Sequence, residues 1–439
     1  MTKRLVNTQR MVNGHPFLFL FFLATAFSTI GQPLSVVKNR VLLNQKVSIT
    51  SFTSDQKAYL LALSQTVDLF LSGSIPDNIE DKVTSKPYEA ELVFFEGIQA
   101  MMQKNQVKAL LKLKRAYHLH RSFLIEDSTN TLSLKSVAVL SIILNEMNQY
   151  NKFAGTLIKA EWSNDKSWLV LQELKKDSLF ALEVSLLEVL LYEFVLYDYD
   201  RASAAMLDLL KLYDDNKFIN YLAAIIFSKN KASKRALTCL NKVNEAWSEY
   251  HYILAKNHYY LLNDSSAKKH FKLYLKQSNP LLVDKSIQYL QLLGDKEQSV
   301  VDNRNSLKKE TLGVLFNYYR LFDAGEFSSV LEGLDKFKSS DFLEDQKTWY
   351  YYLRARSHQY LGQNTLAKVE FLDLLYKCDF TKENYIVPFS CYQVAKLFLS
   401  ENKKGTSLKY IALGLKYKKY PHQGVVRVKM NQLKLELND

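Results

Sequence analysis

The sequence is poor in glycine and proline, with 13 and 7 among 439 residues, whereas average usage is about 7% and 5%. Sandwiches, barrels and doubly wound sheets need many turns marked by these two residues, so their scarcity disfavours all three architectures. Hydrophobic residues make up 47% of the chain and charged residues 23%, which provides a large core and excludes intrinsic disorder. The composition therefore predicts an all-helical protein.

Cysteine is also scarce. The three cysteines, Cys239, Cys378 and Cys391, form no CxxC pair and no even set. An exported protein stabilised by disulfides normally carries more cysteine. We therefore expect these side chains to be small buried hydrophobes, and a single bridge between Cys378 and Cys391 is the alternative.

Acidic residues are absent near both ends of the chain. Residues 1–54 carry six basic residues and residues 402–434 carry nine, with no acid in either stretch. Residues 55–401 carry 43 basic and 43 acidic residues, so the formal net charge of +13 belongs to the ends. The basic C-terminal stretch is a solvated last repeat, a surface for anionic lipid or polymer, or a nucleic-acid site. The lipid interpretation uses Lys416, Lys418 and Lys419.

The N-terminus has the pattern of an export signal, which disfavours nucleic acid as a partner. A basic stretch with Lys3, Arg4 and Arg10 precedes an apolar run at 17–30, shorter than the roughly 20 residues that span a bilayer. Small residues at 26–31 offer two cleavage sites. We expect a signal peptide at 1–31, a linker at 32–52 and a helical repeat domain at 53–439, exported to the periplasm, cell envelope or medium. A membrane anchor and an organellar presequence are the alternatives.

An internal repeat organises the predicted domain. A small residue is followed twelve positions later by a second small residue, and four positions after that by a large apolar residue. Antiparallel helices can approach closely at small side chains, and the bulky residue one turn on fills the space beside them. The five copies are Gly97/Ala109/Leu113, Ala224/Ala236/Leu240, Ala255/Ala267/Phe271, Ala355/Ala367/Phe371 and the weaker Ala395/Ser407/Ile411.

This spacing resembles the tetratricopeptide repeat (TPR), and the best match is residues 350–375, with Ala355, Gly362, Ala367 and Phe371 at motif positions. Degenerate copies are expected at 134–158, 183–210 and 311–337. Residues 384–399 and 417–420 are similar to the end of the TPR family that includes the yeast inclusion-body-clearance protein. The resemblance implies an all-α superhelical solenoid of antiparallel helix pairs, which exposes an extended groove for proteins or peptides.

Sequence motifs for catalysis and cofactor binding are missing: there is no GxxxxGK[ST], HExxH or GxSxG. His118 and His120 point to different helix faces, and His251 and His258 share a face without further ligands nearby. We expect no cofactor, no metal and no catalytic residue. The favoured function is a non-enzymatic scaffold for a protein or peptide. The alternatives are an envelope adaptor that binds anionic lipid or glycan through the basic C-terminal cap, and an envelope enzyme with an unrecognised active site.

The TPR resemblance places motif positions 5 and 9 on the concave side of each first helix. Position 5 is aromatic in all five copies, and position 9 becomes cationic in the last three. Residues four apart share a helix face, and Tyr and Arg are favoured binding anchors; the alternative is that the rings and cation stems pack structurally. With three further tyrosines, the predicted binding strip is Phe94, Tyr221, Tyr252, Lys256, Tyr259, Tyr260, Tyr352, Arg356, Tyr360, Tyr392 and Lys396. An acidic peptide would suit these cations.

We predict that the mature protein begins near Thr29 or Gln32, because signal peptidase cleaves after a short apolar block with small residues at its end. N-terminal sequencing of the protein purified from its native host measures this directly. A cytosolic protein that still begins at Met1 or Met11 would contradict the prediction.

Overall fold

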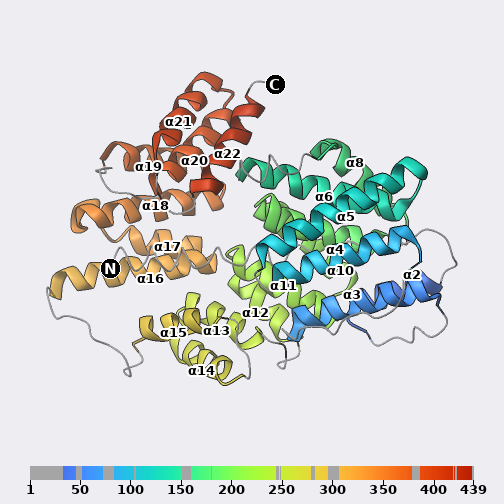
Figure 1. The fold of residues 1–439 in the computed structure, drawn as a ribbon. Coiled ribbons are helices and arrows are strands. Elements are labelled where there is room, and N and C mark those ends of the chain that lie inside the picture. Colours follow the sequence, from blue (N-terminus) through green and yellow to red (C-terminus); the bar gives the residue numbers. More distant parts are fainter. Residues whose placement is uncertain are drawn as a thin grey trace.

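The computed structural model describes residues 33–45, 52–72, 84–102, 105–150, 160–178, 180–243, 247, 249–277, 282–294, 306–377, 386–418, 420 and 423–437. Within these ranges every regular element is a helix, and successive helices pack against each other in pairs (Figure 1). The predicted all-α solenoid of helix pairs is therefore confirmed. The predicted signal peptide, 1–31, lies outside the described residues.

All five predicted repeat copies are helix pairs, and the small and bulky residues that define them are buried. A Cβ atom on Gly97 would lie 2.9 Å from Leu113 Cδ2, so the small residue is what lets the two helices meet. In the weaker copy, Ser407 Oγ donates a hydrogen bond to the Ala395 carbonyl oxygen at 2.8 Å. The pairs are α4 (Lys86–Met102) with α5 (Gln106–Glu126), α11 (Lys217–Lys229) with α12 (Ser233–Leu240), α13 (Tyr250–Tyr260) with α14 (Asp264–Leu275), α18 (Glu344–Tyr360) with α19 (Asn364–Lys377), and α20 (Ile386–Ser400) with α21 (Lys404–Lys416).

Two of the three degenerate copies are also helix pairs. At 183–210, α9 (Ala181–Leu190) continues into the π-helix η2 (Leu191–Val195) and packs against α10 (Tyr199–Leu212). At 311–337, α16 (Ser306–Ala324) packs against α17 (Phe327–Leu334). At 134–158, α6 (Thr131–Tyr150) packs against α8 (Asn164–Lys175), and residues 151–159 lie outside the described ranges. The remaining helices are α2 (Pro33–Leu42), α3 (Ser54–Ser72), α15 (Val283–Leu292), η4 (Ser339–Asp341) and α22 (Gln423–Glu436).

The helix boundaries have local causes. The side-chain oxygens of Asn105, Ser163, Asp198 and Asn216 accept backbone hydrogen bonds at the starts of α5, α8, α10 and α11, as is typical of N-cap residues. The turn between α18 and α19 contains Gly362 at a φ of 75°, a conformation that glycine adopts without strain.

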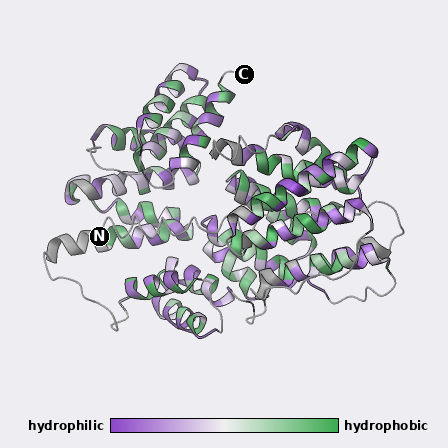
Figure 2. Cartoon of the chain, in the orientation of Figure 1, coloured by the Kyte–Doolittle hydropathy of each residue, from purple (hydrophilic) through white to green (hydrophobic). Residues whose placement is uncertain are grey.

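The apolar residues form two hydrophobic cores. The first runs from α2 to α15 and includes Ala324, and the second runs from Leu315 on α16 to Leu437 beyond α22. Figure 2 shows that most helices carry both hydrophobic and hydrophilic residues, as amphipathic helices packed around a shared core do. We refer to described residues 33–294 as the N-terminal half and to 306–437 as the C-terminal half.

The two halves meet along α16 through apolar packing of Phe316 and Ala324 against the first core and through polar contacts. Arg320 Nε donates to the Tyr259 carbonyl oxygen at 2.8 Å, and Lys231 forms an ion pair with Asp323. Gly325 has a φ of 88° and is so close to the α11–α12 turn that a Cβ atom would lie 1.9 Å from the Lys231 carbonyl oxygen. Apolar packing, a few charged side chains and one close glycine contact therefore all hold the C-terminal half at this point.

The predicted linker at 32–52 is wrong for residues 33–42, which form α2. This helix packs against α3 and α9, and the side chain of Lys38 is fully buried beside Glu183. The charges at 38 and 40 look like part of a polar linker in the sequence, because the acid that pairs with Lys38 is 145 positions away. Among the described residues, α2 is therefore packed as part of the helical array.

We predict that Ala367→Leu lowers the free energy of unfolding by about 1–3 kcal/mol, because a larger side chain overpacks a buried helix contact. Ala367 is 0% exposed on α19. Val369→Leu is the matched control, because Val369 on the same helix is 52% exposed. Equal thermal melting of Ala367→Leu and the control would contradict the repeat packing.

Candidate functional site

The first helices of successive pairs form a continuous row. In the order α11, α13, α16, α18, α20 and α22, each helix contacts the next. We call these six helices the inner row. In TPR-like arrays the first helices line the binding groove, so this row is where the predicted strip should be exposed.

The structure divides the predicted strip into three groups. Phe94 and Tyr221 are 0% and 1% exposed, and both belong to the first core. Four tyrosines, Tyr252, Tyr259, Tyr260 and Tyr352, are buried with 3% to 9% of their surface exposed. The other five are at least partly exposed and lie on α13, α18 and α20; they are Lys256, Arg356, Tyr360, Tyr392 and Lys396.

The burial of Phe94 and Tyr221 has a clear cause. Helices α3 and α6 both pack against α4 and cover Phe94. The Tyr221 ring lies 5.1 Å from the Trp247 ring, and its hydroxyl accepts a hydrogen bond from the Glu249 backbone N–H at 3.3 Å. These two aromatic side chains stabilise the helix packing and present no surface to a partner.

Cation–aromatic pairs do form on the inner row, in a different register from the predicted one. Arg356 lies 4.6 Å from the Tyr360 ring centroid, and its Nη2 donates to the Tyr360 hydroxyl at 2.8 Å. Lys256 lies 5.5 Å from the Tyr260 ring centroid. Each cation therefore stacks on the tyrosine one turn later, and Arg356 also forms a hydrogen bond with Tyr352, one turn earlier. Tyr360 also stacks on Phe327 at 4.3 Å, which holds the pair in place.

A cluster of tyrosines supports the pair at Lys256. Tyr289 on α15, which no sequence pattern singled out, lies 4.8 Å from the Tyr259 ring, and its hydroxyl is 3.2 Å from that of Tyr260. Arg320 stacks on Tyr259 at 4.2 Å. Tyr259 and Tyr260 are therefore mainly structural, and they position the edge on which Lys256 lies.

Several cations of the inner row lie near one another. Burial lowers the pKa of Lys256 to about 8; Asp323 opposes the shift, and Lys229 adds to it. Arg356 and Lys396, on α18 and α20, both act electrostatically on Lys429 of α22. An anion entering between these helices would meet several cations at partly desolvated positions, where charge-assisted hydrogen bonds are strong.

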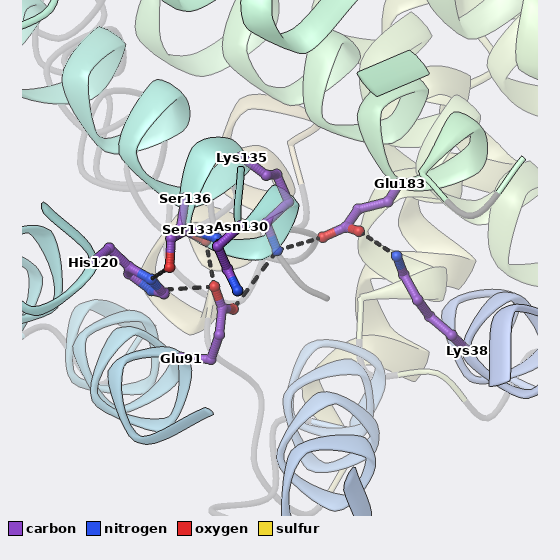
Figure 3. A network of polar contacts seen from close by, with 8 residues as sticks. All are labelled: Lys38, Glu91, His120, Asn130, Ser133, Lys135, Ser136 and Glu183. Atoms are coloured by element: carbon purple, nitrogen blue, oxygen red, sulfur yellow. Dashed lines mark hydrogen bonds and ion pairs between the residues drawn. The ribbon is translucent and has the colours of Figure 1, made fainter. Parts of the chain in front are cut away.

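A second candidate is a cluster of titratable side chains inside the N-terminal half (Figure 3). Glu183 lies 2.5 Å from Lys38 Nζ and 2.9 Å from Lys135 Nζ. Lys135 is also 3.7 Å from Glu91, whose other oxygen is 3.2 Å from His120 Nε2. The hydroxyl and amide groups drawn with them are Ser136, Ser133 and Asn130.

This cluster resembles an acid–base site in composition, but its position rules out contact with a substrate. The side chains of Lys38, Glu91, His120, Lys135 and Glu183 are all 0% exposed. Burial raises the pKa of Glu183, and the two lysines beside it oppose the shift. The cluster therefore ties α2, α4, α5, α6 and α9 together as a buried ion-pair network.

Three histidines meet on the α13–α14 pair. His270 places its Nδ1 3.2 Å from His251 Nδ1, and its ring stacks on His258 at 6.0 Å between centroids. The sequence showed only the two histidines on α13, because His270 comes from the next helix. Among the described residues, no group of three or more His, Cys, Asp or Glu side chains has an arrangement that could hold a metal ion.

Other sequence expectations concern the cysteines, the tail and the membrane. Cys239 and Cys391 are buried free thiols, and Cys378 lies outside the described residues. Lys416 and Lys418 are exposed, and Lys419 is not described. In the part of the chain that the structure describes, no helix has the length and hydropathy needed to cross a bilayer.

No protein-family model and no curated protein matches the chain. A solved structure that is similar, the crystal structure of the P58(IPK) TPR domain, has 13% sequence identity and a TM-score of 0.25. The match covers 92% of this chain and 97% of that chain. At this TM-score the match itself carries no argument, so the TPR-like assignment depends on the helix pairs and buried small residues of this chain. Solenoids of this kind are typically binding scaffolds.

We predict that Lys38→Met lowers the free energy of unfolding by about 3 kcal/mol, because it leaves a buried carboxylate incompletely compensated. Arg40→Met, at an exposed position of the same helix, is the control and should have little effect. Denaturant unfolding at pH 7 and pH 5 measures both.

The loss in Lys38→Met should be smaller at pH 5. A carboxyl whose pKa is higher in the folded chain than in the unfolded chain binds its proton more tightly when folded, so acidification favours the folded variant. A loss that is equal at both pH values, or no loss at all, would contradict the role assigned to Glu183.

Proposed function

We propose that this protein is an exported, non-enzymatic scaffold that binds a protein or peptide partner on the inner row. The observation that carries the proposal is two cation–aromatic contacts, Lys256 with Tyr260 and Arg356 with Tyr360, in which both cations and the Tyr360 ring are at least partly exposed. Arginine and tyrosine side chains dominate binding energy at protein interfaces, because they offer a large contact area and a polar group. The exposed Lys396 and partly exposed Tyr392 on α20 extend the same surface.

The partner that fits this surface is an acidic, extended segment. Lys256, Arg356 and Lys396 form no ion pair with a carboxylate within the described residues, in contrast to Arg354, which pairs with both Asp335 and Glu370. A carboxylate of a partner would supply a direct ion pair, which Lys256 does not form with Asp323 although Asp323 attracts it. The exposed Tyr360 ring and the partly exposed Tyr392 ring would then cover the apolar part of the segment.

Export is supported by the N-terminal sequence and is compatible with the position of α2. Cleavage near Thr29 or Gln32 would leave α2, which begins at Pro33, attached to the domain. Lys38 would therefore reach its buried position in the mature protein. The experiment below also detects lipid or glycan binding, which would identify the protein as an adaptor instead.

The triple variant Lys256→Ala, Arg356→Ala and Lys396→Ala should reduce partner binding by about tenfold or more and flatten its salt dependence. Mature protein is immobilised, and stoichiometric partners are recovered from the native envelope fraction at low and high salt. A matched variant, Lys211→Ala, Lys276→Ala and Lys409→Ala, removes three exposed charges outside the inner row.

The matched variant should bind like the wild type. Unchanged recovery and salt dependence in the folded inner-row variant would overturn the proposal. Enrichment of lipid or glycan without a stoichiometric protein would overturn it in favour of the adaptor.

A further inference from the structure

The last helix closes the inner row into a ring. α22 contacts α6, α6 contacts η2, and η2 leads through α10 back to α11, so the C-terminal half returns to the N-terminal half (Figure 1). At this point Lys429 Nζ donates a hydrogen bond to the Tyr197 carbonyl oxygen at 3.1 Å, although the two residues are 232 positions apart. The same ammonium group lies 5.5 Å from the centroid of the Tyr199 ring. We call these two interactions the closing contact.

The segment that receives Lys429 is suited to an ammonium group. It follows the π-helix η2, and Tyr197 has a φ of 52°, which turns the chain sharply before α10. The carboxylates of Asp198 and Asp200 attract the Lys429 charge. A carbonyl oxygen, an aromatic face and carboxylates are the groups that bind a lysine side chain.

Positive charges near Lys429 oppose the closing contact. Arg356 and Lys396, which belong to the proposed binding surface, repel Lys429. Burial lowers the pKa of Lys429 to about 8, because the ammonium group is partly removed from water. The contact therefore places a cation of α22 next to the cations that a partner would bind, in a position that costs solvation energy.

The rest of the fold does not depend on the closing contact. The C-terminal half has its own core, and its other end is held at α16 by the contacts of Arg320 and Lys231. At this end the two halves are joined by the closing contact and by the contact of α22 with α6. The ring can therefore open at this point while both halves stay folded, as local opening with a low free-energy cost requires.

We infer that α22 controls access to the cation–aromatic surface by closing the ring through Lys429. An acidic segment that enters the ring competes with Asp198 and Asp200 for Lys429 and neutralises the neighbouring cations, so binding and opening favour each other. Opening of the ring needs no partner and can be measured on this chain by itself. Its effect on binding rests on the proposed function.

The first test needs no partner. Lys429→Ala should increase amide hydrogen exchange by about tenfold in residues 196–200 and 424–430, because it removes the closing contact. Its melting temperature should stay close to that of the wild type. Lys434→Ala, an exposed lysine of the same helix, is the control. Exchange in Lys429→Ala that equals the control would overturn the inference, and so would a loss of protection throughout the C-terminal half.

The second test uses a fluorescent random copolymer of glutamate and tyrosine as an acidic, aromatic probe. Tyr199→Leu weakens the closing contact without changing any charge, so it should speed probe association severalfold. Association that is unchanged in this variant, while probe binding still depends on Lys256, Arg356 and Lys396, would overturn only the inference that α22 controls access. The proposed function would then stand. Binding that is independent of those three cations would instead contradict the proposed function.

Discussion

Small residues at the contacts between paired helices set how closely the helices approach, and the remaining structure depends on that distance. Gly97 faces Leu113, and Ala367 is fully buried in the contact between α18 and α19. Because each pair is compact, the first helices can also contact one another and form the inner row. The row in turn brings Arg356 and Lys396 close to Lys429. The charge pattern of the site is thus a consequence of helix spacing.

Much of the fold was predictable because its signals are local. A small residue and its partner twelve positions later lie in one helix pair, so their spacing in the sequence shows their contact in space. The site was harder to predict, because exposure depends on residues far away. Tyr221 occupies the same repeat position as the partly exposed Tyr392, but Trp247 and Glu249 lie against it. The positions of Lys38 and Lys429 depend on Glu183 and Tyr197, which no local pattern connects to them.

The chain uses buried and partly buried charges for two different purposes. In the N-terminal half, Lys38 and Lys135 neutralise Glu183 away from water, which fixes the position of α2. On the inner row, Lys256 and Arg356 stack on tyrosines and keep part of their surface exposed. The buried lysines beside Glu183 can only stabilise the fold. The inner-row cations can still leave a neighbouring ring or a water molecule and bind a partner instead.

The most direct test of the central claim is site-specific photo-crosslinking in cells of the native host. A benzophenone amino acid replaces Tyr360 on the inner row or, as the control, Tyr376 on α19, which is 89% exposed. Binding on the inner row predicts one dominant crosslinked protein from position 360 and none from position 376. The same product from both positions, or a product from 376 alone, would contradict the account.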